Sequence, residues 1–363
     1  MEFNKETLLL QNEIRKFAKE VIAEKVDEFD KQGICPLENI KKLGEMGILG
    51  STIPESYGGC ALDTVSFLVS LEEITKVCPS TALILLTHNT LFSYPIVKFG
   101  NEEQKKKYLS RLASGEIIGG FAETTTNEIT TLEENNSYIV SGKNHILLNG
   151  SANGPFIIFV ESKGKTNALI IDETTSSITR NKKDNIIGMN AGGITEIAFD
   201  NCRVPISNRL GNDGNGKSIL DEIKTFANLG FSAINLGISE ASMENAIKYA
   251  KERIQFGEPI INFGMVREMI ADMATKIEAI RNLVYDAGNI RDSNKEVLRA
   301  SAIARYFSNQ AVAEITTNAI QIYGGYGYMK DYPVERYFRD AQVSRILCSS
   351  TVDIKELITS KTI

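Results

Sequence analysis

The chain has 363 residues, of which 42% are hydrophobic and 24% are charged, and its formal net charge is −6. This composition is typical of a globular protein with two or three cores, and the acidic balance argues against a nucleic-acid or anionic-membrane binder. No apolar run approaches the ~18–20 residues of a membrane-spanning helix, and the charged first residues do not resemble a signal peptide.

Residues 1–117 are predicted to form a helical N-terminal domain. Ile14, Phe17 and Val21 recur at helical spacing, with charged residues between them. Segments rich in Gly and Pro, such as residues 53–59, separate the helices. Further helices are expected over residues 36–48, 64–77, 80–98 and 102–113.

Residues 118–212 change to short apolar runs between turn residues, and no helical pattern lies between the runs. This spacing predicts a central antiparallel β-barrel or sandwich domain. The expected strands include residues 138–140, 156–160, 169–171 and 197–199.

Residues 213–363 return to the helical period over longer segments, which predicts a C-terminal four-helix bundle. The expected fold class is therefore α+β: a helical domain, a β domain and a bundle. The four bundle helices are expected over residues 218–252, 262–290, 295–323 and 334–359.

Residues 211–218 match the phosphate-binding pattern GxxxxGK[ST] letter for letter. The mechanism of that loop requires a buried strand of a parallel sheet directly before it. The preceding residues, 202–210, are polar and interrupted by Pro205. We interpret the segment as a loop that joins the β domain to the bundle.

Few residues are suited to metal or disulfide chemistry. The five cysteines are scattered without CxxC spacing, which predicts a cytoplasmic protein without disulfides. The two histidines, His88 and His145, lie in no ligand-like cluster, so we expect no metal site.

Two motifs at predicted helix ends are suited to a nucleotide cofactor. Residues 253–257 combine Arg253 with Phe256, which could bind a phosphate and stack on a base. Gln321 is followed by the glycines Gly324 and Gly325, which permit close approach of the backbone to a pyrophosphate. Helix capping and subunit packing explain each motif equally well when it is taken alone.

Together these motifs resemble the acyl-CoA dehydrogenase family, and the resemblance covers nearly the whole chain. It includes Tyr57-Gly58-Gly59, the run from Phe99 to Lys105 and Ala113-Ser114-Gly115-Glu116. It continues through the two motifs above to Tyr332-Pro333-Val334-Glu335-Arg336 and Arg339-Asp340-Ala341.

The resemblance implies an FAD-dependent homodimer or homotetramer that oxidises an acyl thioester. A carboxylate removes the α proton, and flavin N5 accepts the β hydride. By position, Arg253 and Phe256 would contact the FAD of a neighbouring subunit. The resemblance further places Gln321, Gly324 and Gly325 at the pyrophosphate or adenosine end. It places Phe121, Glu123 and Thr124 beside the isoalloxazine, through backbone and hydroxyl contacts.

The sequence departs from the family at the catalytic base. The position of the usual glutamate holds Cys348 or Ser349, depending on the direction of counting, and the alternate position on the first bundle helix holds Ala227. The catalytic residue is therefore left open. Glu123 is a weak candidate, because relatives carry an aliphatic residue there and a carboxylate beside the flavin is costly unless it is used or paired.

Two other departures affect the flavin side of the site. About eight residues are missing before Tyr138, and the usual Trp-Ile-Thr-Asn-Gly has become residues 146–150, Ile-Leu-Leu-Asn-Gly. Leu148 replaces a threonine that donates a hydrogen bond near flavin N5, and its side chain has no donor.

Three function classes stay open. The first is a flavin dehydrogenase of thioesters on CoA or an acyl carrier protein, with a relocated or absent base. The second is a flavin oxidase or monooxygenase on the same fold, and the third is a non-catalytic binding subunit. We favour the first; the acyl group and the electron acceptor are not predicted.

Overall fold

The N-terminal part of the chain is helical in the computed structural model, which describes residues 3–123, 127–183 and 185–362. The sequence caps several of these helices. For example, the Asn101 side chain accepts a hydrogen bond from the N–H of Gln104, and the Gln104 side chain accepts one from Asn101 in return. The helices are α1 (Lys5–Phe17), α2 (Val26–Gln32), α3 (Leu37–Glu45), α4 (Thr64–Thr75), α5 (Pro79–Leu86), α6 (Tyr94–Phe99) and α7 (Glu102–Ala113).

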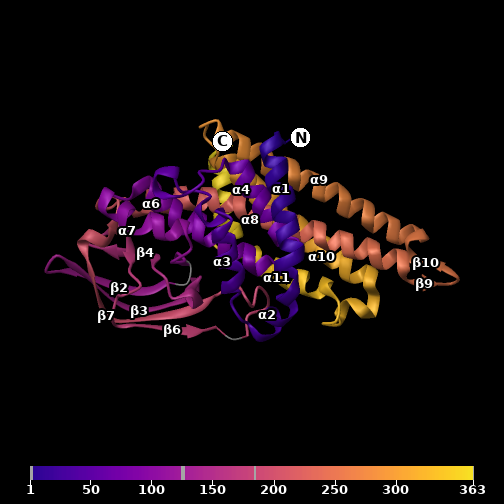
Figure 1. Ribbon diagram of the computed structural model, residues 1–363, viewed down its shortest axis with the longest axis horizontal. Coiled ribbons are helices and arrows are strands. Elements are labelled where there is room, and N and C mark those ends of the chain that lie inside the picture. The colour runs from indigo at the N-terminus through magenta and orange to yellow at the C-terminus, as the bar shows by residue number, and fades with distance from the viewer. Residues whose placement is uncertain (1–2, 124–126, 184, 363) are drawn as a thin grey trace.

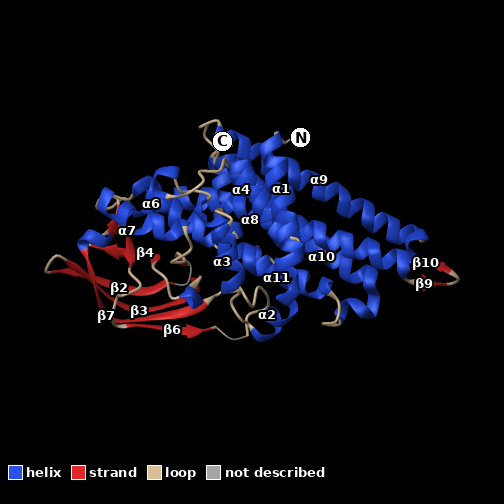
Figure 2. Ribbon diagram, in the orientation of Figure 1, coloured by secondary structure: helices blue, strands red, loops and turns tan. Residues whose placement is uncertain are grey.

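The central part of the chain forms a sheet that packs beside the N-terminal helices (Figures 1 and 2). Alternation along its strands directs Phe121 and Ile157 toward the helices, and Ala122 and Phe156 into a smaller core on the other face. The strands are β1 (Gly120–Ala122), β2 (Asn127–Glu134), β3 (Ser137–Leu148), β4 (Phe156–Ser162), β5 (Lys165–Ile171), β6 (Ile178–Lys182), β7 (Thr195–Pro205) and β8 (Arg209–Leu210).

The predicted central β domain is present as one open sheet, and the described strands do not close into the barrel that our prediction gave beside a sandwich. Its strands follow the order β6-β7-β3-β1-β4-β5-β8, with β2 paired to β3. All pairs are antiparallel except β1 with β4, which makes the sheet mixed. A sheet closes into a barrel only when its two edge strands, here β6 and β8, pair with each other in a staggered register. The edge strand β8 has only two residues and pairs with β5 on one side, and the other edge, β6, is a short, largely exposed strand.

The C-terminal part forms the bundle, which extends away from the sheet and carries a small hairpin at its far end (Figure 1). The predicted fourth helix is two helices, because the backbone turns at Cys348, where φ is +66°. Ser350 then caps a new helix through a capping box with Asp353. The elements are α8 (Gly216–Glu252), β9 (Ile254–Gln255), β10 (Glu258–Pro259), α9 (Gly264–Asp292), α10 (Leu298–Tyr323), α11 (Pro333–Ser344) and α12 (Thr351–Ser360).

The strand that precedes the phosphate-loop-like segment is β8, which pairs antiparallel with β5. The sheet therefore lacks, at this point, the parallel strand that a nucleotide-binding loop needs. Gly216 begins α8 against the backbone of Thr166, at a distance where an added Cβ would lie 2.6 Å from the Thr166 oxygen. The glycine here allows close packing of helix against strand.

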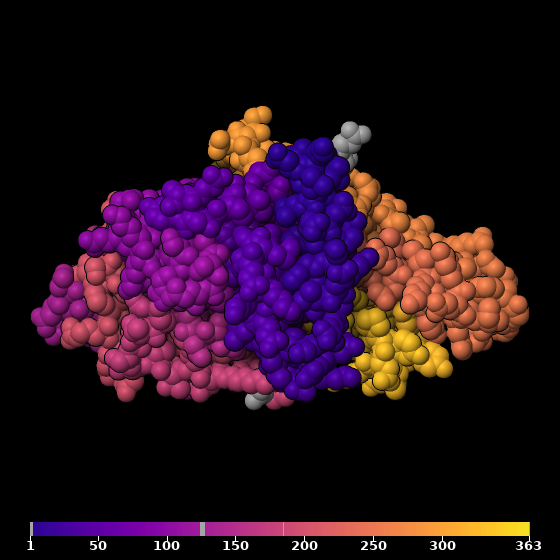
Figure 3. Space-filling view, viewed as in Figure 1, coloured from indigo at the N-terminus to yellow at the C-terminus, as the bar shows by residue number. Residues whose placement is uncertain are grey.

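The N-terminal segment lies between the sheet and the bundle and covers the middle of the face in Figure 3. Helix α4 approaches α8 closely at Gly237, where an added Cβ would lie 2.6 Å from the Glu72 oxygen and 2.7 Å from Thr75 Cβ. Of the helices that the structure describes, none combines the length and apolar character needed to cross a membrane.

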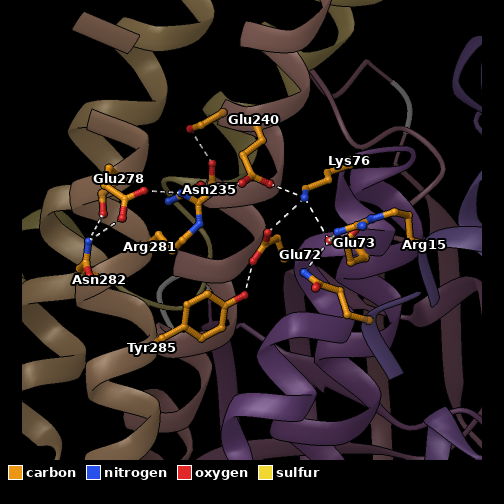
Figure 4. A network of polar contacts seen from close by, with 12 residues as sticks. Arg15, Glu72, Glu73, Lys76, Asn235, Glu240, Glu278, Arg281, Asn282 and Tyr285 are labelled. Atoms are coloured by element: carbon orange, nitrogen blue, oxygen red, sulfur yellow. Dashed lines mark hydrogen bonds and ion pairs between the residues drawn. The ribbon is translucent and has the colours of Figure 1, made fainter. Parts of the chain in front are cut away.

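A buried ionic network joins α4 to the bundle beside this contact (Figure 4). Lys76 Nζ lies 3.2 Å from Glu72, 3.1 Å from Glu73 and 2.6 Å from Glu240, all measured to carboxylate oxygens. Burial and the Glu240 charge raise the pKa of Glu72 to about 7. Each carboxylate has a second partner: Arg15 donates to Glu73, Arg281 donates to Glu240, and the Tyr285 hydroxyl donates to Glu72.

Candidate active site

The predicted site residues form two clusters. One lies at and after β1 of the sheet, where Glu123 contacts Cys348 of the bundle. The other lies beside the β9–β10 hairpin, which Figure 1 shows at the end of the bundle away from the sheet. Because of this separation, the two clusters of one chain do not form a single site.

The cluster at the far end surrounds a pocket of about 490 Å³. Arg253, Gly324 and Gly325 all line it, and the Arg253 guanidinium lies 5.6 Å from the centre of the Tyr326 ring. An added Cβ on either glycine would meet no atom within 4 Å, so open space borders the backbone there. A guanidinium, an aromatic face and accessible backbone fit the phosphate and adenosine end of a dinucleotide.

Two further predicted residues are exposed at the same end. The Phe256 side chain is 96% exposed at the tip of the hairpin, where φ is +50°, and Gln321 lies on the surface near the end of α10. An aromatic side chain held so far from its own core is suited to contact with a neighbouring copy. This placement is consistent with the expected cofactor contact across subunits.

The cluster at the sheet–bundle junction centres on Glu123, which is 2% exposed. Its Oε2 accepts a hydrogen bond from the backbone N–H of Cys348, at 2.6 Å. The structure thus brings together two of the residues considered for the base. Two hydrogen bonds from β3 fix the backbone of Glu123. The Asn144 side chain donates to the backbone carbonyl oxygen of Glu123 at 2.7 Å, and the Glu123 N–H donates to the carbonyl oxygen of Ile146 at 2.8 Å.

The Cys348 thiol is in a poor environment for a thiolate. Burial raises the pKa of Cys348 well above its ordinary value, and the Glu123 carboxylate raises it further. The opposing cations, Arg305 and Lys224, have a smaller effect. At neutral pH the thiol is protonated, and it therefore has no capacity to accept a proton.

Neither of the remaining base positions carries a basic group. Ser349 Oγ lies 3.3 Å from the Asn228 Oδ1 of α8, to which it donates. Ala227 is fully buried in α8. A hydroxyl and a methyl group do not act as general bases near neutral pH.

On the predicted flavin side, Phe121 is a buried residue of β1. Its side chain is 1% exposed and packs against Phe159, with 6.1 Å between ring centres, as part of the core between sheet and helices. Leu148, directly opposite on β3, is fully buried. Only backbone atoms of Phe121 are therefore suited to a cofactor contact. Thr124 lies outside the described residues.

Two models of family domains match the chain. The acyl-CoA dehydrogenase N-terminal domain matches residues 4–116, and the acyl-CoA dehydrogenase C-terminal domain matches residues 223–348. The chain belongs to the acyl-CoA dehydrogenase family. It is 37% identical over 374 residues to an acyl-CoA dehydrogenase of Bacillus subtilis (strain 168), across 99% of this chain and 98% of the relative.

Solved structures of family members share the fold. Butyryl-CoA dehydrogenase from Megasphaera elsdenii matches with a TM-score of 0.94 and 31% identity, covering 100% of both chains. The prolyl acyl carrier protein oxidase AnaB matches with a TM-score of 0.93 and 26% identity, covering 99% of this chain and 100% of AnaB. As an acyl-CoA dehydrogenase family member, the chain is a dehydrogenase-type flavoprotein that uses FAD.

Sequence reasoning missed three residues that shape the site of this dehydrogenase family member: Asn144, Asn228 and Arg305. Arg305 is fully buried over the Phe231 ring, and its Nη2 donates to the carbonyl oxygens of Ser344 and Leu347. Burial lowers the pKa of Arg305 to about 9. A charged residue inside an apolar helix face was the available signal for it; the two asparagines carried no comparable signal.

Proposed function

We propose that the chain oxidises an acyl thioester with FAD, in an assembly where each cofactor contacts two copies of the chain. The observation that carries the proposal is the pocket beside Arg253, whose open glycine backbone suits a phosphate group. The pocket lies at the hairpin end of the bundle, away from the sheet that carries Glu123, and this arrangement supports sharing of each cofactor between two copies (Figure 1).

In this proposal the residues of the far pocket bind the cofactor, and those around Glu123 surround the reacting part of the substrate. Arg253 neutralises phosphate charge, and Gly324 and Gly325 let a phosphate approach the backbone. The chemistry that FAD supplies when bound is acceptance of the β hydride at N5. The side chains at the sheet–bundle junction around Glu123 are buried, which would keep water away from a thioester bound there.

The thioester carrier is the finer part of the proposal. Among the similar proteins one is named for butyryl-CoA and another for a prolyl acyl carrier protein. We propose a short acyl thioester, on CoA or on a carrier protein, as the substrate class. Because AnaB is named an oxidase, direct use of oxygen is the second candidate function.

The test is the visible absorption spectrum of the purified protein with excess FAD, followed by anaerobic addition of butyryl-CoA or of acyl thioesters on carrier protein. A stoichiometric flavin band that a thioester bleaches is the expected result. A protein that binds no flavin, or whose flavin no thioester reduces, would contradict the proposal. Oxygen consumption during turnover separates the oxidase from the dehydrogenase.

A further inference from the structure

We propose that Glu123 is the general base of this chain and that its carboxylate removes the α proton of the acyl thioester. The inference rests on the function proposed above. Of the four positions considered for the base, Glu123 is the one that carries a carboxylate, a group that serves as a general base in many enzymes. It lies against the backbone of Cys348, whose own side chain is held as a thiol, and neither Ser349 nor Ala227 is basic.

The Glu123 carboxylate reaches the segment where the family's usual glutamate is expected. Its Oε2 lies 2.6 Å from the N atom of Cys348, the residue found by counting from Asp340. In this chain the carboxylate comes from the end of β1 in the sheet, rather than from the segment after α11 in the bundle. The acidic group is thus retained at the junction although its position in the sequence has changed.

The strand beside Glu123 is irregular in a way that orients this residue. The pairing of β3 with β7 changes register between Asn144 and Leu147. At this irregularity the Asn144 side chain donates a hydrogen bond to the backbone carbonyl oxygen of Glu123. Such bulges redirect side chains and occur often beside active sites. The neighbouring Cys348 thiol is influenced by Glu123 itself, by Lys224 of α8 and by Arg305 of α10.

The backbone of Cys348 is strained. Its φ of +66° lies in the left-handed region, which is unfavourable for a residue with a side chain. Such strain persists where surrounding contacts maintain it, and it is concentrated at functional sites. The hydrogen bond from the Cys348 N–H to Glu123 is one such contact.

The proposed step is a proton transfer. The Cα–H bond of the thioester breaks, an O–H bond forms on Glu123, and the electron pair stays on the α carbon, delocalised into the thioester carbonyl. Reversal of the step in D2O exchanges the α hydrogen for deuterium without any oxidation. Isotope exchange therefore reports on the base independently of hydride transfer.

Glu123→Gln is the matched variant, because Gln keeps the side-chain length and the oxygen that accepts from the Cys348 N–H but does not take up a proton. We expect the rate of anaerobic flavin reduction by butyryl-CoA or the acyl carrier-protein thioester, per bound flavin, to fall by ~10²–10⁴-fold. Exchange at the α carbon should fall in parallel. Unchanged thermal stability and flavin content would show that the loss is chemical.

The outcomes separate the two proposals. A wild-type protein that no thioester reduces overturns both, whereas wild-type reduction combined with an E123Q rate within fivefold of it overturns only the role of Glu123. Two double variants test the location of the carboxylate. If E123Q/C348E recovers the rate and E123Q/S349E does not, the reacting carbon lies beside residue 348. If both double variants stay inactive, the placement of the reacting carbon beside Cys348 is overturned.

Discussion

Lys76→Met tests whether the buried ionic network holds the N-terminal helices on the bundle. The Lys76 ammonium contacts three carboxylates, on side chains that are at most 8% exposed. In the variant, Glu73 keeps Arg15 and Glu240 keeps Arg281. Glu72 loses its ammonium partner and keeps the Tyr285 hydroxyl.

The expected cost follows from that difference. Removal of one partner of a buried ion pair destabilises a protein by ~3–5 kcal/mol. Because two of the three carboxylates keep a cation, we expect the lower end, ~3 kcal/mol, or about a hundredfold in the unfolding equilibrium. The pKa of Glu72 is already raised to about 7, so protonation at low pH relieves part of the cost. The loss should therefore be larger at pH 8 than at pH 5.5.

Urea unfolding at the two pH values, followed by far-UV circular dichroism, measures this loss. Lys41→Met is the control, because Lys41 is an exposed α3 residue with no ion pair to any residue in the described part of the chain. A Lys76→Met variant as stable as the control, or a loss independent of pH, would refute the reasoning.

Three further results are expected. Gly237→Ala should destabilise the protein by ~1–3 kcal/mol in urea unfolding, because the added Cβ would overlap α4. Gly264→Ala is the control, since open space surrounds Gly264, and it should be neutral or stabilising. Equal effects of the two substitutions would contradict the packing argument. Burial raises the pKa of Asp340 to about 7, above its unfolded value, so its stabilising contribution is complete below about pH 4 and is lost as pH rises to 7. Asp340→Asn should flatten the stability profile over that window, and an unchanged slope would disprove the assignment. Arg253→Ala or Gln321→Ala should lower the FAD content of the purified protein, measured from its absorption spectrum; full occupancy in both would exclude the cofactor assignment.

The sequence predicted the order of helical, β and helical regions because apolar periodicity reports local structure directly. It failed where closure and breaks depend on other contacts. A barrel and an open sheet have the same strand alternation, and their difference lies in edge pairing. The break before α12 contains no glycine or proline, and its available signal was the Ser350–Asp353 capping box.

The site shows the same division between local and distant information. Family motifs pointed to Arg253 and Gly324 from short strings of sequence, and counting along the chain placed Cys348 or Ser349 at the position expected for the glutamate. The sequence did not reveal the contact between Glu123 and Cys348. These residues are 225 positions apart and meet through the register of the sheet and its packing on the bundle. The sequence alone thus determined the family and the cofactor class. Tertiary structure decided which carboxylate lies against Cys348, because only the folded chain brings the end of β1 to the turn between α11 and α12.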